Sequence, residues 1–147
     1  MKIYLDTSAL NRIFDDQSHP HIYLEATAML IIFMLIESQS IEIVSSDVLM
    51  FENVKNPYSE RQKFVDLILS KTNEYQTINE KIVNRAQAIE KLNIKGIDVL
   101  HLACAEELGV NCFITCDKRI LKNYKGPIEV KNPVDFITNV LQKEENQ

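Results

Sequence analysis

The sequence predicts a three-layer α/β/α fold with a mainly parallel central sheet of about five strands. Short apolar runs typical of buried strands alternate with segments of helical periodicity along the whole chain. Glycine is scarce, with three residues in 147, and no repeat or low-complexity linker divides the chain. This length fits one domain with a substantial core, so we expect a single domain over residues 1–142 and a polar C-terminal tail over residues 143–147.

The N-terminal third begins with an apolar run over residues 2–5, which predicts a buried strand. A helix is expected over residues 8–14. After a polar break, a long apolar helix rich in Ala, Leu, Met and Ile is expected over residues 23–38. A second strand is predicted at residues 41–44, and a helix at residues 47–54.

In the middle of the chain, Asn56-Pro57 fits a cap followed by proline at the first helical position, which predicts a helix to about Ser70. A short strand is expected near residues 75–76. The next helix is predicted from a capping box formed by Thr77 and Glu80. Its apolar residues keep helical spacing at Ile82, Ala86, Ile89 and Leu92.

The C-terminal third is punctuated by two clear signals. Gly109 is a good C-cap for a helix over residues 97–108. Asn132-Pro133 predicts the start of a last helix over residues 134–141. Between them we expect a strand, a short helix and a final strand, at residues 112–115, 118–122 and 128–130.

Three carboxylates lie where strands end or helices begin, namely Asp6, Asp98 and Asp117, and a fourth, Glu52, lies on the helix after the second strand and can reach the same edge. In a parallel α/β sheet with right-handed crossovers these places share one edge, and ligands bind there. Acids gathered at one edge repel each other unless a hard divalent cation neutralises them. Taken singly, each Asp reads as a helix cap and Glu52 as a solvated residue. The shared edge favours a metal site for the set.

Other polar side chains near these acids point less clearly to a functional role. Ser8 and Thr115 could orient a ligand or a water as accessory groups, or simply form turn hydrogen bonds. Lys118 and Arg119 follow Asp117 and are candidates for phosphate contacts, although a solvated basic face explains them equally well. His101 lies one helical turn after Asp98 and reads as a packed or hydrogen-bonded helical residue.

The overall composition narrows the class of protein. A net charge of −5 argues against a broadly basic surface for nucleic acid, but it allows a local basic rim beside a metal. The longest apolar run, residues 28–36, is shorter than the roughly 20 residues of a transmembrane helix, and the N-terminus has no signal-peptide pattern. We therefore expect a cytoplasmic protein that does not bind or span a membrane. The three cysteines form no CxxC pair and read as reduced, buried residues.

Taken in order, these residues resemble the PIN-domain nucleases, in particular small prokaryotic PIN proteins such as the ribonuclease toxins of toxin–antitoxin pairs. The resemblance covers essentially the whole chain. It rests on Leu5-Asp6-Thr7-Ser8, on residues 46–52, on residues 98–103 and on Thr115-Cys116-Asp117. Ser8 stands where many relatives have Asn.

The resemblance implies that Asp6, Glu52, Asp98 and Asp117 bind Mg²⁺ or Mn²⁺, directly or through water, and act in catalysis. The implied reaction is cleavage of single-stranded RNA by metal-activated water. It also implies a homodimer and a cognate antitoxin protein, with an RNA-processing nuclease as the alternative within the class.

Two other classes compete with this interpretation. A non-catalytic PIN-like module that binds RNA or protein would keep the acids for folding or for partner contacts. A phosphatase-like hydrolase would use Asp6 as its nucleophile, but it requires a second Asp at the position of Ser8.

Overall fold

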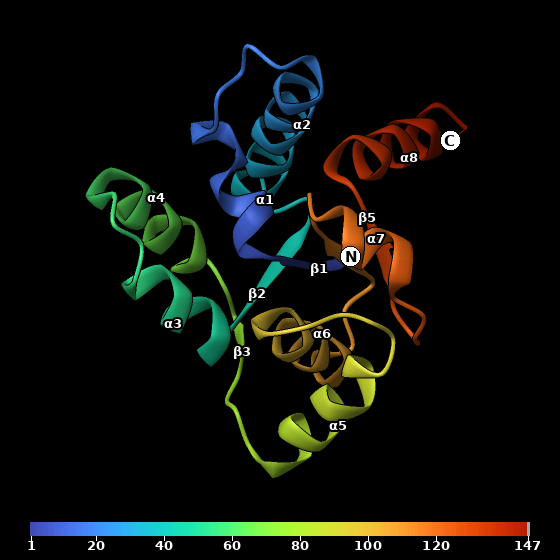
Figure 1. Cartoon of the computed structure of the whole chain (residues 1–147). Coiled ribbons are helices and arrows are strands. Elements are labelled where there is room, and N and C mark those ends of the chain that lie inside the picture. Colours follow the sequence, from blue (N-terminus) through green and yellow to red (C-terminus); the bar gives the residue numbers. More distant parts are fainter. Residues whose placement is uncertain (147) are drawn as a thin grey trace.

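The computed structural model of the protein describes residues 1–146, and in this part of the chain five parallel strands form one sheet (Figure 1). The spatial order is β3-β2-β1-β4-β5. The strands are β1 (Lys2–Leu5), β2 (Glu42–Ser46), β3 (Glu74–Gln76), β4 (Cys112–Ile114) and β5 (Glu129–Lys131). The sheet confirms the predicted parallel arrangement.

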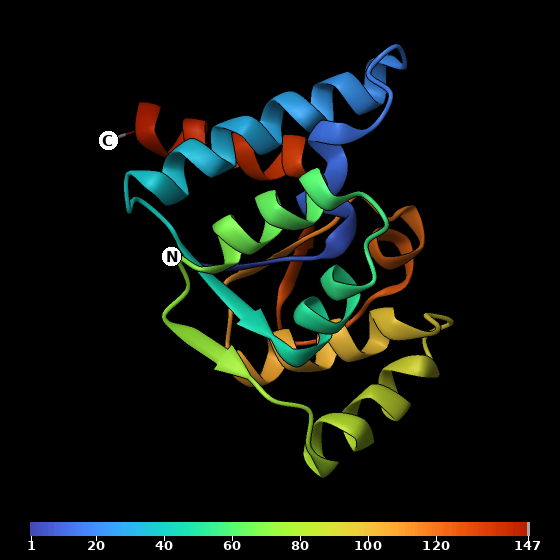
Figure 2. The ribbon, with the colours of Figure 1, turned by 90° about the vertical axis from the view of Figure 1, so that its left-hand side faces the viewer.

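Helices cover both faces of this sheet. They are α1 (Thr7–Asn11), the 3₁₀ turn η1 (Arg12–Phe14), α2 (Pro20–Glu37), α3 (Asp47–Val54), α4 (Ser59–Leu69), α5 (Glu80–Glu90), α6 (Ile97–Leu108), α7 (Lys118–Asn123) and α8 (Pro133–Glu145). Helices α2, α4 and α8 lie on one side of the sheet, and α5 and α6 lie on the other (Figure 2). The three-layer α/β/α fold is therefore confirmed.

The helix starts follow local side-chain chemistry. Several helices begin at a residue whose side chain accepts a hydrogen bond from a first-turn amide, which satisfies an otherwise unpaired donor. These residues are Asp6, Ser46, Asn79, Asp117 and Asn132. The predicted stop at Gly109 is also confirmed, because this residue ends α6 in the left-handed conformation.

Two predicted helix starts are wrong. Helix α4 begins at Ser59 rather than Pro57, because the side chain of Asn56 accepts from the Tyr58 amide at 3.1 Å and forms a turn instead of a cap. Helix α5 is capped by Asn79, whose side chain accepts from the Ile82 amide at 2.9 Å, and not by the predicted capping box. In the second segment both Thr77 and Asn79 are residue types that cap helices, and the local pattern does not decide between them.

The two longest helices are longer than predicted. Helix α2 starts at Pro20, with the proline in its first turn, and α8 continues to Glu145. The division between domain and tail at residue 142 stays a prediction. Helix α2 has the length and composition of a minimal membrane span, with a mean hydropathy of 1.4 over 18 residues. In this fold, however, Met29, Ile32 and other residues of α2 are buried in the core, so it is a core helix.

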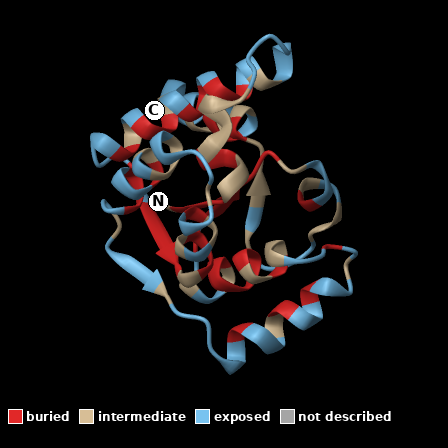
Figure 3. Cartoon of the chain, turned by 60° about the vertical axis from the view of Figure 1, so that its left-hand side comes forward, coloured by how far each residue is buried: buried red, intermediate tan, exposed pale blue. Residues whose placement is uncertain are grey.

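The core is centred on the inner strands, whereas much of β3 and β5 remains accessible (Figure 3). Ile3, Tyr4 and Leu5 of β1 are fully buried. Tyr4 points to the α6 side, where its ring stacks on Phe113 of β4 with centroids 5.2 Å apart and meets His101 of α6 edge-on. This packing ties β1, β4 and α6 into one unit.

The order of the strands places a crevice between β1 and β4. From β1 the chain moves outward through β2 and β3 on one side, then returns to add β4 and β5 on the other. Ligands of open α/β sheets bind at such a switch point, beyond the carboxyl ends of the strands. The Asp6 amide donates to the Ile114 carbonyl at 3.2 Å, which holds the two strand ends side by side.

We predict that Gly96→Ala lowers the free energy of unfolding by about 1–3 kcal/mol. Gly96 precedes α6 with φ 68° and ψ −140°, a region that is essentially restricted to glycine, and no atom within 4 Å would obstruct a Cβ. The cost is therefore conformational. Urea unfolding should show a smaller loss for Gly109→Ala, of about 1 kcal/mol, because Gly109 has ordinary left-handed geometry. Equal losses would contradict this reasoning.

Candidate active site

Asp6 is the buried centre of the candidate site, with 3% of its surface exposed. It caps α1 through one oxygen, Oδ1, which accepts from the Ala9 amide at 3.0 Å and from the Ser8 hydroxyl at 2.7 Å. Its other oxygen, Oδ2, accepts from the Thr115 hydroxyl at 2.5 Å. Burial raises the pKa of Asp6, although the hydrogen bonds from Thr115 and Ser8 favour its ionised form.

The two accessory hydroxyls join the ends of β1 and β4. The Thr115 oxygen accepts from the Asp117 amide at 3.0 Å while its hydroxyl donates to Asp6. The Ser8 oxygen likewise accepts from the Cys116 amide at 3.0 Å. Each hydroxyl therefore uses its donor on Asp6 and its acceptor on the segment after β4, which fixes the orientation of the Asp6 carboxylate.

Asp117 and Asp98 differ in the hydrogen bonds that their carboxylates accept from the protein. Asp117 caps α7, and its Oδ1 accepts from the amides of Arg119 and Ile120 at 2.8 and 3.3 Å. Asp98 lies in the first turn of α6, but the cap position is taken by Gly96. Within residues 1–146, Asp98 accepts no hydrogen bond from the protein. The capping interpretation holds for Asp117 and fails for Asp98.

Glu52 of α3 is held by a chain of hydrogen bonds that starts inside the core. Its Oε1 accepts from the Thr7 hydroxyl at 2.6 Å and from Nε2 of His101. Because a carboxylate only accepts, Nε2 carries a proton. In a neutral imidazole Nδ1 then accepts from the Tyr4 hydroxyl, which lies 2.6 Å away.

This chain of hydrogen bonds keeps Glu52 ionised. Burial alone would raise the pKa of Glu52, but the hydrogen bonds from His101 and from the Thr7 hydroxyl outweigh burial and lower the pKa. The Tyr4 hydroxyl is also 2.7 Å from the Ser46 hydroxyl, so every polar group along this path has a partner.

The charges of the other three acids affect the pKa of Asp98. Its pKa is raised from 3.8 to about 6, first by burial and then by the negative charges of Asp117, Asp6 and Glu52. The four predicted acids therefore share one electrostatic environment at the switch point. No three His, Cys, Asp or Glu side chains in the described part of the chain are already arranged to hold a metal ion.

The donor chemistry fits a hard divalent cation. All four side chains offer carboxylate oxygens, which suit Mg²⁺ and Mn²⁺. Mg²⁺ usually keeps several of its waters, so a few carboxylates suffice. The pKa of Asp98 is raised first by burial and then by the charges of the other acids, and a bound cation would relieve the second of these effects. The ligand roles of Asp6, Glu52, Asp98 and Asp117 stay a prediction that this chemistry supports.

Sequence reasoning left some residues of the site without a role there. Tyr4 and Thr7 were read only as parts of the first strand and its following turn. His101 proves to be a hydrogen-bonded helical residue, as expected, but its bond to Glu52 could not be foreseen. The only available signal was its spacing, one helical turn after Asp98. Lys118 and Arg119 are exposed in the first turn of α7, and their phosphate contacts stay a prediction.

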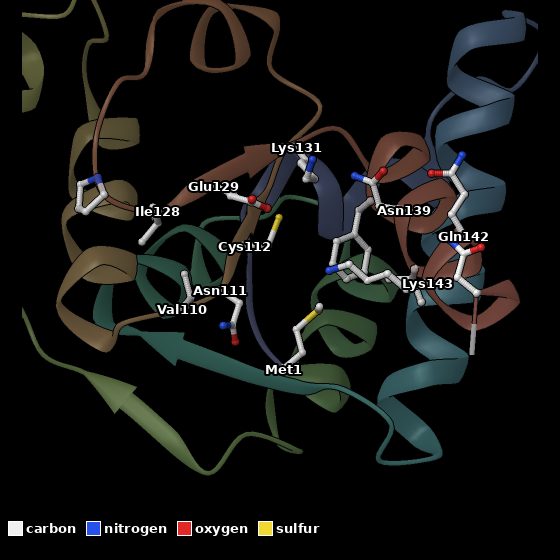
Figure 4. Close-up of a pocket in the computed structure, with 14 residues that line it drawn as sticks. Met1, Val110, Asn111, Cys112, Ile128, Glu129, Lys131, Asn139, Gln142 and Lys143 are labelled. Atoms are coloured by element: carbon white, nitrogen blue, oxygen red, sulfur yellow. The ribbon is translucent and has the colours of Figure 1, made fainter.

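Two hollows flank the sheet, and one of them touches the site. A hollow of about 530 Å³ is bordered by Thr7, Ser8 and Glu52. Another of about 640 Å³ lies at the opposite edge of the sheet, between the amino ends of the strands and α8. Figure 4 shows Met1 and Glu129 on its strand side and Lys143 on its helix side. The first hollow reaches the site through Glu52 and the residues that follow Asp6, whereas none of the four acids borders the second.

The sequence matches the PIN domain family over residues 3–126, which is most of the chain. The chain therefore belongs to the PIN-domain family, a family of nucleases. No curated protein sequence matches it.

Solved structures agree with this fold. A chain of VapBC2 from Rickettsia felis, solved bound to a DNA fragment from the promoter, is similar with a TM-score of 0.59 and 15% identity, over 90% of this chain and 98% of that chain. A chain of a toxin–antitoxin complex from Klebsiella pneumoniae gives 0.54 and 20%, over 89% and 97%. VapBC-1 from nontypeable Haemophilus influenzae gives 0.54 and 16%, over 90% and 98%.

We predict that Asp98→Asn stabilises the protein by about 1 kcal/mol at pH 7 in EDTA, a value reduced for solvent screening of a partly exposed group. The folded-state pKa near 6 lies above the unfolded value near 3.8, so ionising Asp98 destabilises the fold. The gain should be complete above pH 6 and should fade toward pH 4, as measured by urea unfolding. Asp135→Asn, at an exposed carboxylate of α8, is the control. A gain that grows on acidification would refute the argument.

We predict that His101→Leu lowers the free energy of unfolding by about 2–4 kcal/mol, because the substitution leaves the buried Tyr4 hydroxyl and Glu52 without their shared partner. Chemical denaturation at pH 7 measures the change. His21→Leu replaces an exposed histidine and should change stability by less than about 0.5 kcal/mol. Similar values for the two variants would mean that the chain from Tyr4 to Glu52 contributes little.

Proposed function

We propose that this PIN-domain protein is a metal-dependent endoribonuclease that cleaves single-stranded RNA. The observation that carries the proposal is the placement of four carboxylates around the β1/β4 switch point, where the pKa of Asp98 is raised first by burial and then by the charges of Asp117, Asp6 and Glu52. Proteins place like charges together where a cation or a reaction requires them. Family membership supports the nuclease class.

In this proposal Asp6, Glu52, Asp98 and Asp117 hold Mg²⁺ or Mn²⁺. When bound, the ion shields the charge of the phosphodiester and makes water a stronger nucleophile. The protein contributes orientation. Thr115 and Ser8 fix the Asp6 carboxylate, and His101 and Thr7 fix Glu52 in its ionised form. Asp98 has no competing hydrogen bond within the described residues and is available to the ion.

We further propose that the protein is the toxin of a toxin–antitoxin pair. Support comes from the similar chains of VapBC2 and VapBC-1 and of the Klebsiella pneumoniae toxin–antitoxin complex, which share the fold. A cognate antitoxin is the corresponding partner, and a cytoplasmic location is part of the same proposal. The proposed homodimer would cover apolar side chains that α2 leaves exposed, namely Tyr23, Leu24, Leu30 and Met34.

The test combines cleavage with thermal unfolding. We expect cleavage of a labelled single-stranded RNA in Mg²⁺ or Mn²⁺ and none in EDTA. At a concentration of about 100 times its dissociation constant, the ion should also raise the melting temperature by about 5–10 °C, because it binds only the folded cluster. Asp6→Asn and Asp98→Asn should each reduce cleavage by at least about 100-fold and remove the metal-induced shift.

Asp135→Asn should behave like the unaltered chain in both assays. Unchanged cleavage in EDTA, or in both site variants, would refute the proposed mechanism. Metal binding without cleavage would leave a cation site and remove the ribonuclease activity from the proposal. If neither effect is seen, the non-catalytic binding module takes its place.

A further inference from the structure

The hollow of about 530 Å³ beside the acids continues away from them between α3 and the loop that leads into α4. We call it the aromatic groove. At one end it is bordered by Thr7, Ser8 and Glu52, and at the other by Phe51, Tyr58 and Arg61. Of the four acids only Glu52 borders the groove, so a strand that passes Glu52 would extend into it.

Two aromatic rings on the border of the groove are exposed to solvent. Phe51 is 54% exposed and Tyr58 is 59% exposed, although large aromatic side chains are usually buried. Each ring carries a cation. The Lys55 ammonium lies 4.1 Å from the ring centroid of Phe51, and the Arg61 guanidinium carbon lies 4.5 Å from that of Tyr58.

These cations differ in how far carboxylates neutralise them. Arg12 also borders the groove, but it forms ion pairs with Glu25 and Asp15 at 2.9 Å and is therefore committed to the fold. Lys55 forms no ion pair within residues 1–146. Arg61 donates to the Phe14 carbonyl at 2.9 Å and forms one long ion pair, with Asp15 at 3.7 Å. Lys55, and to a lesser degree Arg61, are therefore the positive charges available to an anionic ligand.

The wall that carries Tyr58 is fixed relative to the acids. The Asn56 side chain donates to the Asn11 side chain at 3.2 Å and accepts from the Tyr58 amide at 3.1 Å. Asn11 in turn donates to the Thr7 carbonyl at 2.9 Å, at the start of α1. A short hydrogen-bonded path therefore connects the loop of Tyr58 with the turn that follows β1, so the backbone that carries Tyr58 is positioned before any ligand binds.

We propose that the aromatic groove binds unpaired nucleobases of the RNA strand next to the cleaved bond, with Phe51 and Tyr58 as stacking platforms and Lys55 and Arg61 as phosphate contacts. This inference rests on the proposed ribonuclease function. Exposed rings combined with cations match a single-stranded nucleic acid, which offers a base face and a phosphate in each nucleotide. An apolar peptide would cover the rings but would leave the two cations unpaired, so RNA is the better match.

The chain contains no tryptophan, which allows a direct test. Tyr58→Trp, combined with Asp98→Asn to prevent cleavage, introduces a single fluorophore into the groove. We expect a short single-stranded RNA in Mg²⁺ to quench this fluorescence, because a base stacks on the indole. An abasic strand of the same length has the same phosphates but no bases and should not quench it. Tyr75→Trp on β3, also at an exposed tyrosine and also combined with Asp98→Asn, is the matched control and should not respond.

Binding constants separate the two kinds of contact. Phe51→Leu and Tyr58→Leu should each weaken binding of the intact strand by about 5- to 150-fold and leave the abasic strand unaffected. Lys55→Ala should weaken both strands alike, whereas Lys63→Ala, at an exposed lysine of α4, should weaken neither. Circular dichroism checks that each variant is folded.

Equal binding of intact and abasic strands, or full affinity in both leucine variants, would overturn the proposal and leave the groove to a protein partner. The binding assays do not involve cleavage. Loss of stacking therefore contradicts this inference alone. Stacking without cleavage by the unaltered chain contradicts the ribonuclease proposal instead.

Discussion

The structure depends on one constraint, the gathering of negative side chains at the carboxyl ends of β1 and β4. The hydrogen bonds of Asp6 make this possible. Thr115 and Ser8 each donate to Asp6 and each accept from the segment after β4, so the same bonds orient the carboxylate and join the two strand ends. Buried charges require such partners, because an unpaired one would take up a proton or unfold the site.

The remaining acids are supported in different ways, and the difference has a chemical meaning. Glu52 is kept ionised by His101 and Thr7, whereas Asp98 lacks such support and its pKa rises to about 6. Of these two side chains, Asp98 is therefore the one whose ionised form is destabilised by burial and by the neighbouring carboxylates. Gly96, in a conformation that suits only glycine, starts α6 so that Asp98 is in its first turn but is not consumed as its cap. The ionised Asp98 carboxylate thus lowers the stability of the fold at the position where the proposed function needs a metal ligand without other partners.

Much of this could be predicted from the sequence, because the relevant signals are local. Strand ends, the cap at Asn132 and the stop at Gly109 follow from neighbouring residues, and they place Asp6 and Asp117 at one edge. The bond between His101 and Glu52 joins residues far apart in the chain, and no local pattern shows it. The start of α4 was mispredicted for a related reason, since Asn56 also bonds Asn11 across the aromatic groove.

The net charge of −5 limits how such a protein can hold RNA. A broadly negative chain gains little from long-range attraction to phosphates. Local interactions must then supply the affinity, and stacking is one that does not depend on overall charge. The exposed rings of Phe51 and Tyr58 provide it beside the acids, and the available cations, Lys55 and Arg61, lie on those rings. In our interpretation the aromatic groove therefore supplies by stacking the affinity that the negative net charge does not supply by long-range attraction. In the proposed function the groove would bind unpaired bases by local contacts, and the carboxylates would bind the cation.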